Sequence, residues 1–199
     1  MSTKHQIVII GGGNAGISVA AQFLKKDASL DIAIIDGANK HYYQPAWTMV
    51  GGGFYDINNT VRDESTVIPE NAHWIKENVI SFQPEQNTVT LKSGVEVHYD
   101  YLVVAPGIQL NWNEIKGLEE NLGKNGVCSN YSFSTAPYTY TCLKIQKRGK
   151  QYSPVLIHPL NVVVHLKKLC ISLQIISKKI IYPIKFNVNF GLVVLNYLA

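Results

Sequence analysis

The chain of 199 residues is long enough for one domain and part of another, and its 18 Lys+Arg and 14 Asp+Glu give a formal net charge of +4. The charge is unevenly placed. Residues 1–120 hold all 14 acids and 8 of the 18 basic residues (8 − 14 = −6), whereas residues 121–199 hold 10 basic residues and no acid. These positives are scattered among Ile, Leu and Val, which excludes a nucleic-acid-binding patch. No apolar run reaches the ~18 residues that span a bilayer.

The cysteines and the N-terminal sequence indicate the cellular compartment. The three cysteines form no C-x-x-C or other metal-type pair, so we expect free thiols and no metal site; they are Cys128, Cys142 and Cys170. The opening MSTKHQIVII runs directly into an apolar strand, without the pattern of a signal peptide. The sequence therefore predicts a cytoplasmic protein.

The first elements follow the order strand, glycine turn, helix, strand. Residues Gln6–Ile10 form a β-branched run typical of a buried parallel strand. The run GGGNAG (11–16) comes next, and Ile17–Lys26 then reads as a helix with an apolar face. A second apolar strand, Asp31–Ile35, ends in Asp36. This order predicts the first βαβ unit of a dinucleotide-binding fold.

The glycine run satisfies G-x-G-x-x-G at Gly11, Gly13 and Gly16. In this motif the first glycine makes the tight turn, the second lets a pyrophosphate approach the backbone, and the third lets helix and strand pack closely. Asp36 is expected to accept hydrogen bonds from an adenosine ribose and to disfavour a 2′-phosphate there. By analogy with two-dinucleotide flavoproteins, whose FAD motif lies at the N-terminus, we expect FAD rather than NAD.

Short alternating strands follow residue 59, separated by turn signals. We expect them to form an antiparallel meander inserted as a crossover; their bounds are Trp74–Lys76, Val79–Phe82, Thr88–Leu91 and Val95–His98. A buried strand, Tyr101–Ala105, then returns to the sheet and ends in Ala-Pro-Gly (105–107), where a glycine lets backbone approach a flavin.

The run HYYQPAWTMVGGG (41–53) follows the ribose acid and is expected to be a half-buried loop. Two interpretations remain open for its aromatic residues. They are either hydrophobic packing residues or part of a segment that lies along a flat ring system. The Gln-Pro turn and the glycine triplet favour the second interpretation.

Five sequence runs together resemble the sulfide:quinone oxidoreductases, in particular the branch with the mitochondrial enzymes. These runs are IIGGGNAG (9–16), HYYQPAWTMVGGG (41–53), VIP (67–69), APGIQLNWNEIKGL (105–118) and GVCSNYS (126–132). The resemblance implies an FAD enzyme that oxidises sulfide to sulfane sulfur and reduces a membrane quinone. It also implies that sulfide attacks a cysteine disulfide near the flavin, after which the freed thiolate reduces the flavin.

The resemblance also assigns residues. It implies that six of them hold the ADP part of FAD: Gly11, Gly13, Asn14, Ala15, Gly16 and Asp36. Gln44 and Pro45 are expected near the flavin, and Ala105, Pro106 and Gly107 are expected to close over the cofactor. Cys128 is the candidate redox residue, at a position where some relatives carry cysteine and others do not. Cys142 is expected to pack within a helix, Tyr138–Lys144.

The resemblance ends near residue 144, and the coding possibilities of the tail predict why. Read one base early, the codons for VVVHLKKLCISLQIISKKIIYP (162–183) are compatible with CGGAPQKIMYLAADYFKKNNIS, which contains the redox-cysteine motif that the family places here. This sequence fixes the last two bases of each shifted codon. Only its first base, the wobble base of the preceding original codon, is free, so this agreement is not expected by chance. We therefore expect residues 145–199 to be an out-of-frame tail and this chain to be truncated and inactive.

The predicted fold is α/β: an incomplete, Rossmann-like, three-layer FAD-binding fold with an inserted antiparallel β-meander. Residues 1–110 are expected to be its first segment, and residues 111–144 the start of a second nucleotide-type domain. The expected partners are sulfide and quinone, with no nucleic acid, and only an intact enzyme would lie peripherally on the inner membrane face. Two alternatives stay open: another two-dinucleotide flavoprotein, either an NADH dehydrogenase or a disulfide or persulfide reductase, and a non-enzymatic FAD-binding fragment.

Overall fold

The computed structural model describes residues 3–145, 151–154, 184–189 and 192–197. These residues group into two units. The first contains Met1–Tyr43 and Val61–Leu110, and the second contains Gln44–Thr60 and Asn111–Ala199. The segment 44–60, which lies within the expected domain 1–110, thus groups with the second unit. No helix among the described ranges is long and apolar enough to cross a membrane.

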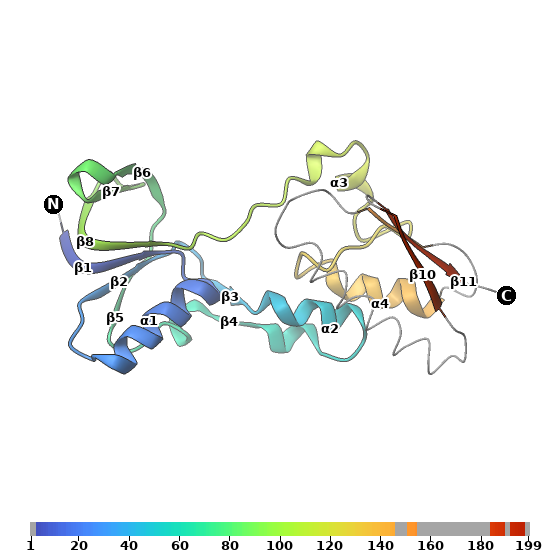
Figure 1. Ribbon diagram of the computed structural model, residues 1–199, viewed down its shortest axis with the longest axis horizontal. Helices are drawn as coiled ribbons and strands as arrows, with labels where there is room; N and C mark the ends of the chain where they lie inside the picture. The colour runs from blue at the N-terminus through green and yellow to red at the C-terminus, as the bar shows by residue number, and fades with distance from the viewer. Residues whose placement is uncertain (1–2, 146–150, 155–183, 190–191, 198–199) are drawn as a thin grey trace. The chain divides into compact units, whose positions relative to one another are not determined.

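The first unit is built on a six-stranded sheet with the order β5-β2-β1-β8-β7-β6. Its strands are β1 (Thr3–Ile10), β2 (Ile32–Ile35), β5 (Ala72–Ile75), β6 (Val79–Gln83), β7 (Thr88–Leu91) and β8 (Glu96–Val104). The strands β5, β2, β1 and β8 run parallel, whereas β6, β7 and the first part of β8 pair antiparallel. A separate two-stranded ribbon pairs β3 (Lys40–Tyr42) with β4 (Val61–Asp63). Figure 1 shows these strands and helix α1 (Asn14–Lys26).

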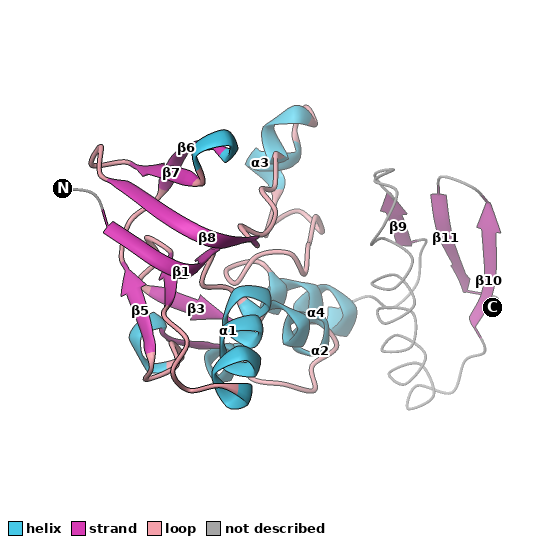
Figure 2. Cartoon of the chain, turned by 60° about the vertical axis from the view of Figure 1, so that its left-hand side comes forward, coloured by secondary structure: helices cyan, strands magenta, loops and turns pink. Residues whose placement is uncertain are grey.

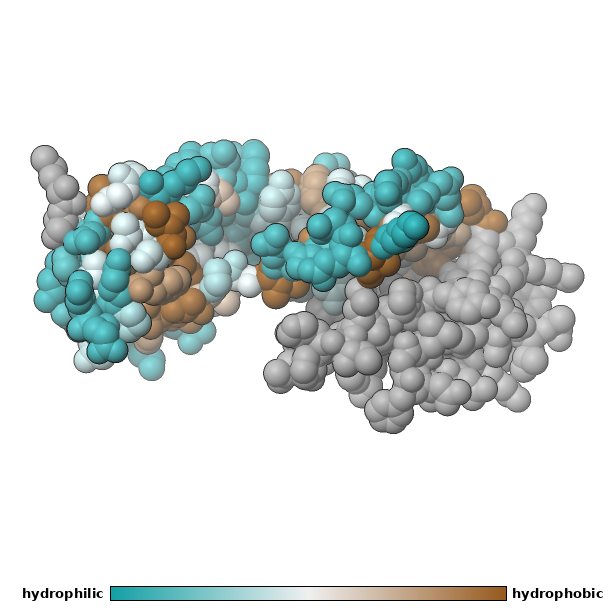
Figure 3. Space-filling model, turned by 90° about the horizontal axis from the view of Figure 1, so that it is seen from above, coloured by the Kyte–Doolittle hydropathy of each residue, from teal (hydrophilic) through white to brown (hydrophobic). Residues whose placement is uncertain are grey.

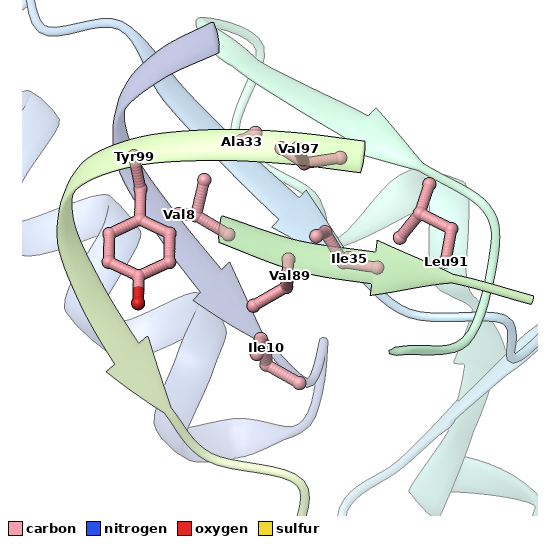
Figure 4. Packing of buried hydrophobic residues seen from close by; sticks show 8 residues of the cluster. All are labelled: Val8, Ile10, Ala33, Ile35, Val89, Leu91, Val97 and Tyr99. Carbon is pink, nitrogen blue, oxygen red and sulfur yellow. The ribbon is translucent and has the colours of Figure 1, made fainter. Parts of the chain in front are cut away.

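The two central parallel strands, β2 and the second half of β1, are buried on both faces, which explains their uninterrupted apolar sequences. Ile7 and Ile9 of β1 lie in one cluster with Ala20 of α1, and partly buried Val19 and Leu24 pack against it. Alternate residues of β1 and β2 point to the other face, where they pack against side chains of β7 and β8. Figure 4 shows this second cluster: Val8, Ile10, Ala33, Ile35, Val89, Leu91, Val97 and Tyr99. Helix α1 covers one face of the parallel strands, and the antiparallel part of the same sheet packs over the other face. This arrangement confirms the predicted three-layer α/β fold.

Two predictions about the strands were wrong. Of the run Trp74–Lys76, Trp74 and Ile75 belong to β5 at the edge of the parallel sheet, where Trp74 pairs with Ile34, and not to the antiparallel meander. The expected strands Val95–His98 and Tyr101–Ala105 form one continuous strand, β8, which pairs with β1 along its length and with β7 only at Glu96–His98. Asp100, which lies between the two expected strands, is exposed and forms an ion pair with Lys4 at 2.9 Å.

The described residues of the second unit form three α-helices: α2 (Trp47–Gly51), α3 (Leu118–Asn121) and α4 (Ala136–Ile145). The expected loop at 41–53 is therefore wrong, because it consists of β3, a 3₁₀ turn at Gln44–Ala46, and α2. Trp47 and Val50 face the same side of α2 and pack against Ala136 of α4. The Trp47 Nε1 donates a hydrogen bond to Thr60 Oγ1 at 3.0 Å. Burial of this apolar pair against α4 favours helix over loop.

Helix α4 confirms the predicted helix around Cys142, a residue of intermediate exposure. Three further strands form an antiparallel sheet with the order β10-β11-β9, and Figure 2 shows them. Their bounds are β9 (Gln151–Pro154), β10 (Ile184–Asn189) and β11 (Leu192–Tyr197). The whole run 162–183, on which the expected frame change depends, lies outside the described residues.

Candidate functional site

The glycine turn connects β1 to α1 and requires glycine at two positions. Gly11 has φ +101°, a conformation that favours glycine, and a Cβ there would overlap the carbonyl oxygen of Ala105. A Cβ on Gly16 would overlap the carbonyl oxygen of Gly11 and crowd the side chain of Ile9. The backbone therefore passes closer at both positions than any side chain permits. Helix α1 begins at Asn14, three residues before the expected start, because the glycine run itself forms the first turn.

Gly13 differs from its neighbours, because the fold does not require a glycine there. Its backbone angles, φ −72° and ψ −176°, suit any residue, and no atom lies within 4 Å of the place where a Cβ would stand. The space over Gly13 is open. Gly13 is also the N-cap of α1, and amide groups in the first turn of a helix lack partners within the helix. Open space beside such amides, at the positive end of a helix dipole, suits a phosphate group.

Asp36 lies at the end of β2 and is held against this turn. Its Oδ2 accepts a hydrogen bond from the backbone N–H of Gly12 at 2.6 Å, and its Oδ1 accepts one from the N–H of Ala38 at 2.7 Å. The indole Nε1 of Trp74 donates to the backbone carbonyl of Asp36 at 2.9 Å. The structure thus brings the predicted ribose acid together with the glycine turn, and it places Trp74 where its fluorescence can report on the site.

Ala105 and Pro106 follow β8 and also lie at the glycine turn, and Gly107 comes next in the chain. The Ala105 N–H donates to the carbonyl of Ile10 at 2.8 Å, and the Ala105 carbonyl is the atom that crowds Gly11. Gly107 has φ +80° and open space around its Cβ position. Two strand ends that are distant in sequence, those of β1 and β8, thus meet at one edge of the sheet, where open α/β folds bind ligands.

Two side chains at the turn were not predicted as site residues, His41 and Glu64. The His41 Nδ1 donates to the carbonyl of Gly12 at 3.2 Å, and its Nε2 forms a hydrogen bond with the Asn14 side chain at 3.0 Å. Glu64 is only 2% exposed, and its Oε2 lies 3.6 Å from His41 Nδ1. His41 begins the run 41–53, so the motif itself pointed to it. Glu64 lies in the polar run RDES, which carries no signal of burial.

Three predicted site residues lie in the second unit: Gln44, Pro45 and Cys128. Gln44 and Pro45 form the 3₁₀ turn before α2. Cys128 is exposed as a residue, yet its thiol lies beside Thr139 and Cys142 of α4. Local burial of the thiol raises the pKa of Cys128, and the nearby Thr139 hydroxyl only partly offsets this effect. A thiol with a raised pKa is mostly protonated near neutral pH and is a poor nucleophile.

Within the described ranges, no group of three or more metal-ligating side chains gathers at one place. The chemistry available at the glycine turn consists of backbone amides, the Asp36 carboxylate, and the polar side chains of Asn14, His41 and Glu64. This set suits the binding of a phosphate-linked nucleotide.

Comparison with known proteins agrees with this geometry. The family model for pyridine nucleotide-disulphide oxidoreductases matches residues 5–136. The chain is 49% identical over 145 residues to the mitochondrial sulfide:quinone oxidoreductase of Dictyostelium discoideum, and 36% identical over 145 residues to that of Mus musculus. These matches cover 72% and 73% of this chain but only 32% of each relative, so the chain spans about a third of their length.

A solved structure shows the same likeness. The X-ray structure of the sulfide:quinone oxidoreductase from Aquifex aeolicus matches with a TM-score of 0.57 and 29% sequence identity. The match covers 71% of this chain and 32% of that chain. The resemblance to sulfide:quinone oxidoreductases that the five sequence runs indicated is thereby confirmed.

Proposed function

Because the chain belongs to the pyridine nucleotide-disulphide oxidoreductase family, we propose that its N-terminal part is the FAD-binding segment of an oxidoreductase that acts on sulfide and a quinone. The observation that carries the proposal is the open space over Gly13, which caps the first turn of α1 and follows Gly12, whose N–H binds the Asp36 carboxylate. The relatives supply the substrate class, since those described above are sulfide:quinone oxidoreductases.

The residues present fit the ADP part of FAD. The open Gly13 leaves room for the pyrophosphate beside the amides of Asn14 and Ala15, and Asp36 offers acceptors to ribose hydroxyls. Gly11 and Gly16 let the turn close so that these amides converge. Ala105–Gly107 would cover the cofactor from the β8 side. When bound, FAD supplies a two-electron carrier, while the protein supplies binding and orientation.

We also propose that residues 145–199 are read in a shifted frame and that a frame-corrected protein contains the family's redox-cysteine motif. In that protein the quinone site and any peripheral contact with a membrane would lie beyond the part that the family model matches. Two other functions remain as alternatives: a related flavoprotein that oxidises NADH or reduces persulfides, and a fragment that binds FAD without catalysis. Reduction of the bound flavin by sulfide, but not by NADH, would separate the first proposal from both.

Replacing Asp36 with alanine is expected to weaken FAD binding by about 1–3 kcal/mol, because hydrogen bonds to a charged acceptor are lost. The substitution also frees the Gly12 amide that Asp36 holds. Titration of the protein with FAD, followed by quenching of tryptophan fluorescence, measures the change in Kd. The matched control is Asp27→Ala, which removes an exposed carboxylate that bonds only to Ser29. Equal Kd values for Asp36→Ala and Asp27→Ala would show that Asp36 does not contribute to FAD binding.

Replacing Cys128 with serine in a frame-corrected protein is expected to leave at least part of the sulfide-dependent quinone reduction. The raised pKa of this thiol disfavours the thiolate that an essential redox cysteine needs. Steady-state quinone reduction measures the effect, and flavin content controls for folding. Complete loss of activity with normal flavin content would make Cys128 an essential redox thiol.

A further inference from the structure

Glu64 is a buried acid that the proposed function does not use. It begins the 3₁₀ turn Glu64–Thr66 directly after β4, and its N–H donates to the carbonyl of Asn39 at 3.0 Å. Glutamate is rarely fully buried unless its carboxylate is paired, because removing a charge from water is costly. A side chain that is 2% exposed therefore needs a specific reason for its position.

The carboxyl group lies against the glycine turn. A Cβ placed on Gly12 would stand 2.5 Å from Glu64 Oε1 and 3.3 Å from Asp36 Oδ2. Both carboxyl groups therefore converge on the residue whose N–H binds Asp36. Glu64 Oε1 is buried and has no hydrogen-bond partner among the described residues. An unpartnered buried oxygen at this place indicates that Glu64 has a role at the glycine turn beyond packing.

Two titratable groups face Glu64 from other elements, Asp36 after β2 and His41 in β3. Asp36 brings a like charge, whereas His41, 3.6 Å away, attracts the carboxylate only when the imidazole is protonated. On its own segment, Asp63 is exposed and pairs with Lys40 at 2.6 Å. Burial, followed by the charge of Asp36, raises the pKa of Glu64 to about 7. Both causes favour the neutral acid.

We propose that Glu64 is a positioning residue that makes dinucleotide binding depend on pH. As a neutral acid it fills the inner side of the glycine turn without adding charge. As a carboxylate it places a second negative charge beside Asp36, under the turn that receives the pyrophosphate. The negatively charged ligand is repelled, so its affinity falls as the pH rises through neutrality. The inference rests on the proposed function, because it concerns the same site.

Thermodynamic linkage predicts whether FAD binding takes up or releases a proton. A bound pyrophosphate favours the neutral form of a nearby acid, so binding raises the pKa of Glu64 further. Above neutral pH, FAD binding should therefore take up a proton from solvent. Near pH ~5, where Glu64 is already protonated, binding should take up none.

The test is the Kd of FAD for the frame-corrected protein, measured by tryptophan quenching at about pH 6 and about pH 8.5. Wild type is expected to bind about tenfold more weakly at the higher pH, the effect of one added charge near the ligand. Glu64→Gln is expected to bind with the same Kd at both values. The control Glu70→Gln removes an exposed acid of the same unit and should keep the wild-type pH dependence.

Each other outcome is informative. A pH dependence that persists in Glu64→Gln would assign the effect to another group, such as His41, and overturn the inference alone. Equal affinity of wild type at both pH values would do the same. Absence of FAD binding at both pH values would overturn the proposed function and the inference together. If Glu64→Gln fails to fold, calorimetry of wild type in two buffers of different ionisation enthalpy decides, because no proton uptake above neutral pH would contradict the inference.

Discussion

Replacing Gly13 with valine in a frame-corrected protein is expected to abolish FAD binding while the first unit stays folded. A Cβ at this position meets no described atom within 4 Å beyond its own chain neighbours, so we expect the valine side chain to enter the space proposed for the pyrophosphate. We expect Kd to rise at least about a hundredfold, whereas loss of a favourable N-cap costs about 1 kcal/mol of stability. Tryptophan quenching measures binding, and chemical unfolding measures stability in the same samples.

Gly16→Val is the matched contrast. Its Cβ overlaps the Gly11 carbonyl, so this variant should lose stability by more than about 3 kcal/mol and lose FAD binding through unfolding. Gly13→Ala should give an intermediate Kd with the same N-cap cost of about 1 kcal/mol as Gly13→Val. If Gly13→Val keeps the wild-type Kd, the dinucleotide does not bind at this turn.

Correcting the reading frame by one base near codon 145 is expected to give a soluble protein with bound FAD. In the present chain, Tyr101–Val104 of β8 pair with β1 but with no other described strand. Tyr101, Val104 and Ile108 are 67%, 55% and 69% exposed. Figure 3 shows apolar surface in brown on the described part of the molecule. An open strand edge beside apolar surface favours aggregation.

The C-terminal segment of the corrected chain should pack against the open edge of β8 and the exposed apolar side chains. Soluble yield and flavin absorbance after purification compare the corrected protein with the present one. Equal solubility and equal flavin content of the two products would contradict the proposed frame change, because the tail would then contribute nothing that the corrected segment restores.

The glycine turn was predictable because its constraints are local. Gly11 and Gly16 are fixed by backbone contacts within one βαβ unit, and the spacing to Asp36 follows from the lengths of α1 and β2. The three layers were predictable for a similar reason. Ile7–Ile10 are apolar without interruption, and such a strand must be covered on both faces.

The errors arose where tertiary contacts override local pattern. Asp100 interrupts an apolar run, yet β8 continues through it because pairing with β1 satisfies the backbone and Lys4 pairs with the side chain. The Trp47 segment reads as a loop from its Gln-Pro start, but packing against α4 makes it helical. Glu64 was missed because nothing in its local sequence distinguishes a buried acid from an exposed one.

Anaerobic mixing of the frame-corrected, FAD-loaded protein with sulfide tests the central claim most directly. The proposed function predicts that sulfide bleaches the flavin absorbance and that added quinone restores it, whereas NADH leaves it unchanged. Bleaching by NADH without bleaching by sulfide would contradict the proposal and would assign the chain to the NADH-oxidising branch of the same family.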